Sequence, residues 1–178
     1  QEIFSRLRDS GGHLLPVVND ILDFSKIESG KLKIEKRPFA LFAVLDNVRS
    51  FLSELAEAKG LALSISLAPD LSEWVEGDSL RLAQILTNLL SNALKYTPEG
   101  GRVDVRLAPE VLDGREGVRL TCADTGIGIA EADTGDVFTP FFRSSRPEAR
   151  RRPGTGLGLA ITERVVTLLT TMFERNGV

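Results

Sequence analysis

The apolar positions of this sequence repeat with two different periods. Where they recur every three or four residues, the pattern predicts helices. The predicted helices cover 1–29, 39–59, 157–173 and the first part of 80–101. On the helix at 39–59, the side expected to face the core carries Leu41, Leu45, Val48, Leu52 and Leu55.

Alternation of apolar and polar residues predicts strands between these helices. It marks 31–38, 61–67 and 74–76, and further along 103–107 and 118–122. The last two strands flank an Asp-Gly pair, which is a strong turn signal, so an antiparallel hairpin is expected there.

The order of the elements predicts an α+β fold. We expect a two-layer α/β sandwich with helices on one face of a mostly antiparallel, mixed sheet. Residues 124–156 have no strong period and form a long loop. Two domains are expected, a helical segment at 1–30 and the sandwich at 31–178. The helical segment carries a heptad-like seam that needs a partner helix: Ile3, Leu7, Leu14, Val17, Ile21 and Phe24.

Composition narrows the classes of function. The chain has 178 residues and a formal net charge of −3, so bulk attraction to nucleic acid is not indicated. The one cysteine, Cys122, excludes an internal disulfide and fits a reducing compartment; its alternating surroundings favour a buried structural thiol. One His and one Cys are too few for a metal site built on those residues. No run of about 18 apolar residues occurs, so no membrane span is expected.

The helix that opens 80–101 has an unusual polar stripe. Its apolar face carries Leu82, Ile85, Leu86, Leu89, Leu90 and Ala93, and its polar stripe carries Arg81, Gln84, Asn88, Asn92 and Lys95. Asn is a poor helix former, so two Asn one turn apart suggest a purpose. Amide oxygens suit a partly hydrated Mg²⁺ that holds phosphates. A solvated face that happens to contain Asn is the alternative, and this helix alone does not decide. Asp78 is expected to cap its N-terminus.

Two glycine motifs follow the hairpin. Asp124, Gly126 and Gly128 come directly after its second strand, where glycines let the backbone turn and approach a ligand. The Asp124 carboxylate there suits the exocyclic amine of adenine. Residues 154–159, GTGLGL, open the last helix and expose N–H groups to anions. Each motif alone fits a structural turn, but the order Asn helix, DxGxG, loop, GxGxG is more specific. No P-loop signature occurs, and GTGLGL follows a loop, which argues against a Rossmann site.

These motifs resemble the N, G1 and G2 boxes of the sensor histidine kinases. The resemblance lies in NLLSNALKYTPEGG at 88–101, DTGIG at 124–128 and GTGLGL at 154–159. It extends to VFTPFF at 137–142, which is similar to the F box, and to HLLPVVNDILDFSKIESGKL at 13–32, which is similar to the second dimerisation helix. The resemblance implies the Bergerat-type ATP-binding fold, which type II topoisomerases, mismatch-repair ATPases and a heat-shock chaperone share.

The resemblance also implies roles for individual residues. Asn92 would coordinate Mg²⁺ with assistance from Asn88, Lys95 would contact phosphate, Tyr96 would pack by the nucleotide, and Asp124 would bind the adenine amine. The implied catalytic residues are Asn88 and Lys95.

The glycine motifs and the loop between them would complete the nucleotide site. Gly126 and Gly128 would fit the base and the lid hinge. Residues 129–153 would form the ATP lid, anchored by Phe138, Phe141 and Phe142, with Arg143 as the best candidate among its arginines for phosphate contact. A solvated mobile loop is an equally good interpretation of those arginines. The phosphate cradle would be Gly154, Thr155, Gly156, Leu157 and Gly158.

Asn88 separates two activities of this fold. In the ATPase branch the equivalent residue is a Glu that activates water, whereas an amide cannot act as general base near neutral pH. Transfer of the γ-phosphoryl group to a protein histidine is therefore expected. The alternatives are a nucleotide-binding regulatory module without catalysis and a Bergerat-type ATPase.

The sequence departs from the family pattern in two places. His13 has no acidic neighbour and no Arg, so the phosphoacceptor histidine is expected upstream, outside this chain. After the last helix we expect the usual final strands to be absent, with reduced stability or strand exchange in a dimer as the consequence.

Cofactors, partners and location follow from the same resemblance. ATP and Mg²⁺ are the implied cofactors. A histidine-bearing dimerisation domain and a response regulator receiver domain are the implied partners, with a homodimer through the N-terminal helix. The implied location is cytoplasmic, either free or as the cytoplasmic part of a membrane-bound sensor.

Overall fold

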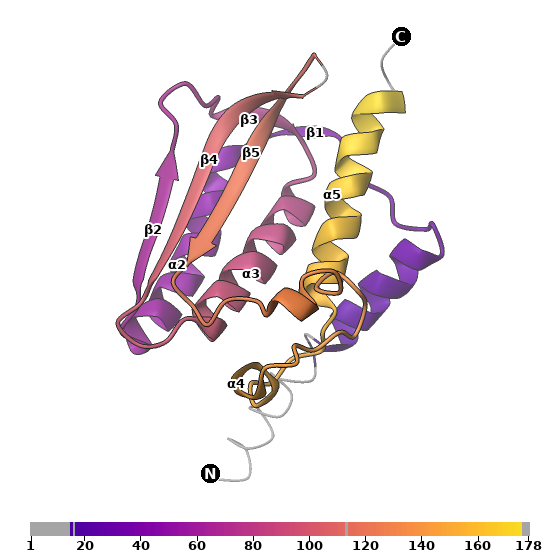
Figure 1. The fold of residues 1–178 in the computed structure, drawn as a ribbon. Coiled ribbons are helices and arrows are strands. Elements are labelled where there is room, and N and C mark those ends of the chain that lie inside the picture. Colours follow the sequence, from indigo (N-terminus) through magenta and orange to yellow (C-terminus); the bar gives the residue numbers. More distant parts are fainter. Residues whose placement is uncertain (1–14, 16, 113, 176–178) are drawn as a thin grey trace, which may run out of the picture. The chain divides into compact units, whose positions relative to one another are not determined.

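The computed structural model describes residues 15, 17–112 and 114–175, and Figure 1 traces them. His13 and Asp113, which the sequence singles out, lie outside the described residues. The chain divides into two compact units, one formed by Ile34–Glu131 and the other by the segments on either side of it.

The unit Ile34–Glu131 contains a three-stranded sheet. Its strands are β2 (Ala62–Leu67), β4 (Arg102–Leu112) and β5 (Arg115–Asp124), in the order β2-β4-β5. β2 and β4 are parallel, whereas β4 and β5 are antiparallel with Leu112 opposite Arg115. The predicted hairpin is confirmed, and its strands are longer than the alternation alone marked.

Two helices cover one face of this sheet, α2 (Leu41–Ala58) and α3 (Ser79–Tyr96), as Figure 1 shows. A separate antiparallel pair is formed by β1 (Arg37–Ala40) and β3 (Trp74–Gly77). The mixed, mostly antiparallel two-layer architecture is as predicted, except that β1 and β3 form a small sheet of their own.

The core of this unit lies between the helices and the inward face of the sheet. Strand alternation places Val103, Val105 and Leu107 of β4 in the core, and each is essentially inaccessible to solvent. Cys122 pairs with Val105 and is half-buried, and burial raises the pKa of its thiol. The helices contribute Leu41, Leu45, Val48, Leu52, Ala56, Leu86, Leu90, Ala93 and Leu94.

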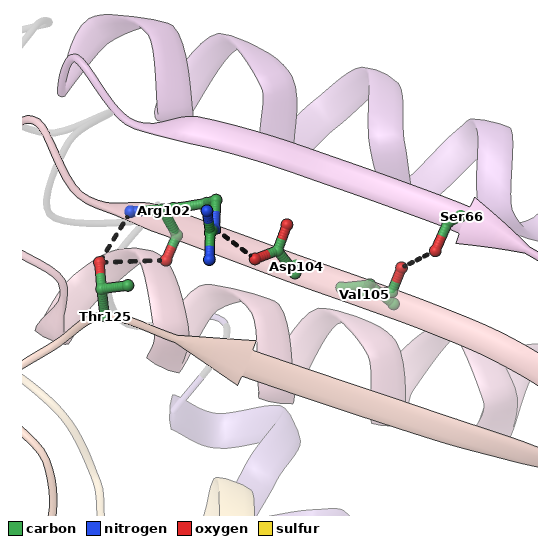
Figure 2. A network of polar contacts seen from close by, with 5 residues as sticks. All are labelled: Ser66, Arg102, Asp104, Val105 and Thr125. Carbon is green, nitrogen blue, oxygen red and sulfur yellow. Dashed lines mark hydrogen bonds and ion pairs between the residues drawn. The ribbon is translucent and has the colours of Figure 1, made fainter.

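The opposite face of the sheet is polar. Arg102 and Asp104 alternate with the buried valines of β4 and form an ion pair, with Nε 2.6 Å from Oδ2 (Figure 2). The hydroxyl of Ser66 on β2 donates to the carbonyl of Val105 at 3.3 Å. One apolar and one polar face is the arrangement expected of a sheet covered on one side.

The second unit contains the helical residues 17–28, a short 3-10 turn η1 (Glu131–Asp133) at its boundary, α4 (Pro147–Arg150) and α5 (Gly158–Arg175). The predicted last helix is therefore confirmed, and the long loop holds only short helical turns. None of the helices in the described part of the chain combines the length and the apolar character that a membrane span requires.

Two local predictions are wrong. The strand predicted at 31–38 begins only at Arg37, because the β1 ladder can extend only as far as its four-residue partner β3. On α2 the core residue is Ala56, whereas Leu55 is 49% exposed. An α-helix has 3.6 residues per turn, whereas the predicted core positions repeat every 3.5 residues. By the fourth turn the buried side of the helix has therefore moved from Leu55 to the next position.

Candidate functional site

Asp78 fixes the start of α3. It is buried, and its Oδ1 accepts from the backbone N–H of Arg81 at 3.0 Å, which confirms the predicted N-cap. Its Oδ2 accepts from the backbone N–H of Glu35, also at 3.0 Å. One carboxylate therefore anchors both the helix and the segment that leads into β1.

The two faces of α3 match the predicted stripes. The buried residues are Ile85, Leu86, Leu90, Ala93 and Leu94, with Leu82 and Leu89 half-buried. Asn88 and Asn92 are half-buried and stand four residues apart, so they share one face of the helix. Arg81 on the same stripe donates to the side-chain oxygen of Gln84 at 2.7 Å. The hydroxyl of Ser91 donates to the carbonyl of Asn88 at 3.2 Å.

Lys59, which follows the end of α2, caps the C-terminus of α3. Lys59 Nζ donates to the carbonyls of Leu94 at 2.5 Å, Lys95 at 3.1 Å and Thr97 at 2.5 Å. A cation is favourable at this end of the helix dipole. The buried Thr97 adds its N–H and hydroxyl, both directed at the carbonyl of Ala93 at 3.0 and 2.7 Å.

Sequence reasoning missed Lys59, and no local signal marks it. It is the last residue before the glycine that ends α2, and nothing in that position predicts contact with a helix 35 residues later. Its effect is to hold the backbone that carries Lys95 and Tyr96. In that segment Lys95 Nζ lies 4.7 Å from the centre of the Tyr96 ring.

The DTGIG motif lies against this same end of α3. The N–H of Ile127 donates to the carbonyl of Tyr96 at 3.2 Å, and the N–H of Gly126 donates to Asp124 Oδ1 at 2.8 Å. A Cβ on Gly126 would stand 2.5 Å from that oxygen and 2.9 Å from the Tyr96 carbonyl oxygen. Only glycine permits this approach. The structure therefore brings Asp124 and Gly126 together with Tyr96.

Thr125 ties the motif to the sheet. Its hydroxyl accepts from the N–H of Arg102 at 2.9 Å (Figure 2). Its own N–H donates to the Arg102 carbonyl at 3.0 Å. The exposed Asp124 at the end of β5 therefore lies between its ladder pairing with Val103 and the contacts of Thr125. Gly128 follows in a left-handed conformation, with φ +67°.

In the second unit the glycine-rich motif is packed on the F-box segment. The N–H of Phe141 donates to the carbonyl of Gly156 at 3.0 Å. A Cβ on Gly156, whose φ is +74°, would stand 2.6 Å from the carbonyl oxygen of Phe142. Glycine is required here by conformation and by space. The structure thus brings VFTPFF and GTGLGL together, a contact that the sequence did not predict.

Thr155 closes the start of α5. The N–H of Leu157 donates to the Thr155 hydroxyl at 3.2 Å, and that hydroxyl donates to Oδ2 of Asp20 at 3.2 Å. Burial raises the pKa of the Asp20 carboxyl, and the hydrogen bond from Thr155 opposes that rise. The sequence placed Asp20 in the N-terminal helix but gave no sign of this contact.

The loop between the motifs is held by side chains that reach backbone groups. Arg143 Nη2 donates to the carbonyls of Arg150 at 2.9 Å and Arg152 at 2.6 Å, so in this structure the guanidinium closes its own loop. Asp133 is buried and accepts from the Ser144 hydroxyl at 2.6 Å and the Ser145 N–H at 2.8 Å. These hydrogen bonds, the first of them most strongly, lower the pKa of the Asp133 carboxyl.

The donor chemistry fits the implied cofactors. Among the described residues no group of three or more His, Cys, Asp or Glu side chains could hold a metal ion. A bound cation would instead take the amide oxygens of Asn88 and Asn92, with water and phosphate completing its shell, which suits Mg²⁺.

The predicted site residues fall into two sets. Asn88, Asn92, Lys95, Tyr96, Asp124, Gly126 and Gly128 belong to the unit Ile34–Glu131, and Arg143 and Gly154 to Gly158 belong to the other unit. Each set is assembled within its own unit. Their convergence on one nucleotide stays a prediction.

A family model described as "Histidine kinase-, DNA gyrase B-, and HSP90-like ATPase" matches residues 77–175, which contain α3, the hairpin, both glycine motifs and α5. The chain belongs to this family of ATPases. Within the family it is of the sensor histidine kinase type, since the mycobacterial sensor histidine kinase MprB is 33% identical with a TM-score of 0.59 over 76% of this chain and 80% of MprB. The signal transduction histidine-protein kinase BarA of Escherichia coli K12 is 42% identical over 158 residues, which is 88% of this chain and 17% of BarA.

Solved structures of two histidine kinases have the same fold. Full-length ShkA in complex with AMPPNP is 34% identical with a TM-score of 0.72, and the match covers 92% of this chain and 32% of ShkA. The histidine kinase AdeS of Acinetobacter baumannii is 26% identical with a TM-score of 0.70, covering 94% of this chain and 73% of AdeS. The chain spans only 17% to 20% of the length of the curated relatives it matches.

Proposed function

We propose that this domain binds ATP with Mg²⁺ and passes the γ-phosphoryl group to a histidine on a dimerisation domain. In this transfer the bond between the γ-phosphorus and its bridging oxygen breaks, a bond from a histidine nitrogen to phosphorus forms, and ADP leaves. The observation that carries the proposal is Asn88. Its half-buried amide stands on the polar face of α3, one turn before Asn92.

The amide at position 88 favours transfer over hydrolysis. It has no lone pair basic enough to take a proton from water near neutral pH. Water attack is then unassisted, and the γ-phosphoryl group survives until a protein nucleophile is in line. Phosphoryl transfer depends mainly on positioning and charge neutralisation, so a site without a base is sufficient for it.

The other predicted residues have roles suited to a triphosphate. Asn92 and Asn88 would hold Mg²⁺, which supplies charge neutralisation on the phosphates. Lys95 would contact phosphate, Tyr96 would pack by the nucleotide, and Asp124 would accept from the adenine amine. Gly126, Gly128 and the segment from Gly154 to Gly158 would approach the nucleotide through backbone, with Arg143 from the lid.

The proposed partners are a second copy and the phosphotransfer proteins of a two-component system. Supporting the second copy, an exposed apolar side of the N-terminal helix carries Leu15, Val18 and Leu22, of which Leu15 is 63% and Leu22 51% exposed. That spacing is a helix-packing seam. This side differs from the seam predicted from the sequence, whose Phe24 packs on Phe141 of its own unit. We assign 1–30 to the dimerisation helix and 31–178 to the ATP-binding domain. The acceptor histidine, the response regulator and the cytoplasmic location belong to the same proposal.

Mixing the chain with labelled ATP, Mg²⁺ and a separate domain that bears the acceptor histidine tests the function. Label transferred to that domain supports the kinase. Saturable binding without transfer favours a regulatory module, and steady release of free phosphate favours an ATPase; either result overturns the proposal.

Asn92→Ala tests the site. Loss of a polar contact to a charged group should weaken nucleotide binding by about tenfold to a hundredfold. Asn47→Ala, at an exposed Asn of α2, is the matched control and should leave the affinity unchanged. Equal affinities in the two variants would remove Asn92 from the site.

A further inference from the structure

One side of the N-terminal helix contacts the C-terminal segments of its own unit at regular intervals. Asp20 accepts from Thr155, Phe24 packs on Phe141, and Glu28 pairs with Arg164 at 3.4 Å. The helix residues are four apart, so they form one line along the helix. The exposed seam proposed for a second copy lies on the opposite side, because positions 15, 18 and 22 are rotated by about half a turn from that line.

The first contact ends in the glycine-rich loop. The Asp20 carboxylate orients the Thr155 hydroxyl, since that hydroxyl donates to Oδ2. The lone pairs of the hydroxyl oxygen then point to the N–H of Leu157, which donates to this oxygen at 3.2 Å. A carboxylate on the N-terminal helix thus determines the partner of a backbone N–H at the start of α5.

The second contact reaches the same loop by another route. The Phe24 and Phe141 rings meet edge to face, with centroids 5.9 Å apart and an interplanar angle of 70°. Phe141 has φ +63°, a conformation that is rare for a bulky side chain and is kept only when its surroundings impose it. From that position its N–H holds the carbonyl of Gly156. Asp20 and Phe24 therefore converge on two consecutive residues, Thr155 and Gly156.

We propose that Asp20 and Phe24 are positioning residues that fix the conformation of the glycine-rich loop from the N-terminal helix. Neither residue is among the predicted nucleotide contacts. They set the direction of the Thr155 hydroxyl and of the Gly156 peptide, which the proposed phosphate cradle contains. Any change in this helix that separates Asp20 from Thr155 then changes the affinity of the loop for phosphate. The effect on phosphate affinity rests on the proposed function. The effect on the conformation of the loop, which we call the structural half, does not depend on nucleotide.

Hydrogen exchange of the backbone amides in the nucleotide-free protein tests the structural half. Asp20→Ala should accelerate exchange at Leu157 by about fivefold, the effect of losing one hydrogen bond. Asp20→Asn retains an oxygen that accepts from the hydroxyl and should restore slow exchange. In a Thr155→Val background, Asp20→Ala should have no further effect, because its route to the loop is gone.

The functional half is measured as the dissociation constant of AMPPNP with Mg²⁺. Asp20→Ala should raise it about threefold to tenfold, by the same loss of one ordering contact, and Asp20→Asn should leave it close to the unaltered protein. Asn19→Ala, at the exposed neighbour on the same helix, is the matched control and should change neither readout.

The outcomes separate the two proposals. If the unaltered protein does not bind AMPPNP while Asp20→Ala still accelerates exchange, the proposed function fails and the positioning role stands. The inference is overturned if Asp20→Ala exchanges like Asn19→Ala, or if its effect persists in full in the Thr155→Val background.

Discussion

Two regions of the candidate site are held by different kinds of contact. At the end of α3 the carbonyls of residues 93 to 97 all accept hydrogen bonds, from Thr97, Lys59 and Ile127, and the helix packs on the hydrophobic core of its unit. The glycine-rich loop is instead held by the Asp20 side chain, by the backbone N–H of Phe141 and by one buried side chain of its own, Leu157. The first region is therefore held by many backbone hydrogen bonds and a core, whereas the second is held by a few single contacts.

This difference matters for a nucleotide site. Regions with few buried contacts open at a lower free-energy cost than core elements. The proposed magnesium- and adenine-binding residues on α3 and β5 should keep their geometry with or without ligand. The loop should rearrange on binding if it belongs to the proposed lid.

The largest expected effect comes from the core beneath α3. Leu90 is 1% exposed, and Leu90→Ala should lower the free energy of unfolding by about 3 kcal/mol through lost burial and a cavity. Urea denaturation measures it. Leu80→Ala, at a site 70% exposed on the same helix, should change that free energy by less than about 0.5 kcal/mol. Similar values for the two variants would mean that α3 is not held by this core.

Lys59→Met comes next. It leaves the carbonyls of Leu94, Lys95 and Thr97 without their charged donor, so the free energy of unfolding should fall by about 2 kcal/mol. The same denaturation experiment applies. Lys36→Met, which breaks an exposed ion pair with Glu76, serves as control and should have an effect within about 0.5 kcal/mol. If Lys59→Met matched the control, the backbone at Lys95 and Tyr96 would not depend on this cap.

The sequence was sufficient for features that depend on local pattern. The amphipathic α3, its Asp78 cap, the hairpin and the last helix all follow from period, capping chemistry and turn signals, and all are present. Local pattern also gave the order of the three motifs. It failed at β1, since alternation marks extended backbone but only a partner strand turns that backbone into a ladder.

Contacts between segments that are distant in the sequence could not be predicted from local pattern. Lys59 and Asp20 each contact backbone or side chains far along the chain, and neither belongs to a motif. Asp20 acts through one hydrogen bond and Lys59 through three, and only the folded chain brings their partners close. Leu55 and Ala56 show the smaller failure: a strict heptad assignment loses its phase after four turns of a 3.6-residue helix.

A smaller, local effect is expected at Asp133. Its hydrogen bonds to Ser144 and Ser145 hold the carboxyl pKa below the ordinary value of an aspartate. Such a group contributes its stabilisation fully above the ordinary pKa, and the contribution is lost as the pH falls through the lowered pKa. Asp133→Asn should therefore accelerate amide exchange at Ser145 several-fold near neutral pH, without moving the global unfolding transition. In the unaltered protein the Ser145 amide proton shift should titrate with a midpoint below the ordinary value; a midpoint above it would contradict the assignment.

The smallest effect is expected on the polar face of the sheet. Asp104→Asn removes the exposed ion pair with Arg102 (Figure 2), and the free energy of unfolding should change by less than about 0.5 kcal/mol. Val105→Ala, the next residue on β4 but on the buried face, should cost about 2 kcal/mol. Both variants leave the backbone ladder intact, so urea denaturation compares the two faces of one strand directly. A larger loss from Asp104→Asn than from Val105→Ala would mean that surface charge, instead of the core, holds the strand that anchors Thr125 and the DTGIG motif.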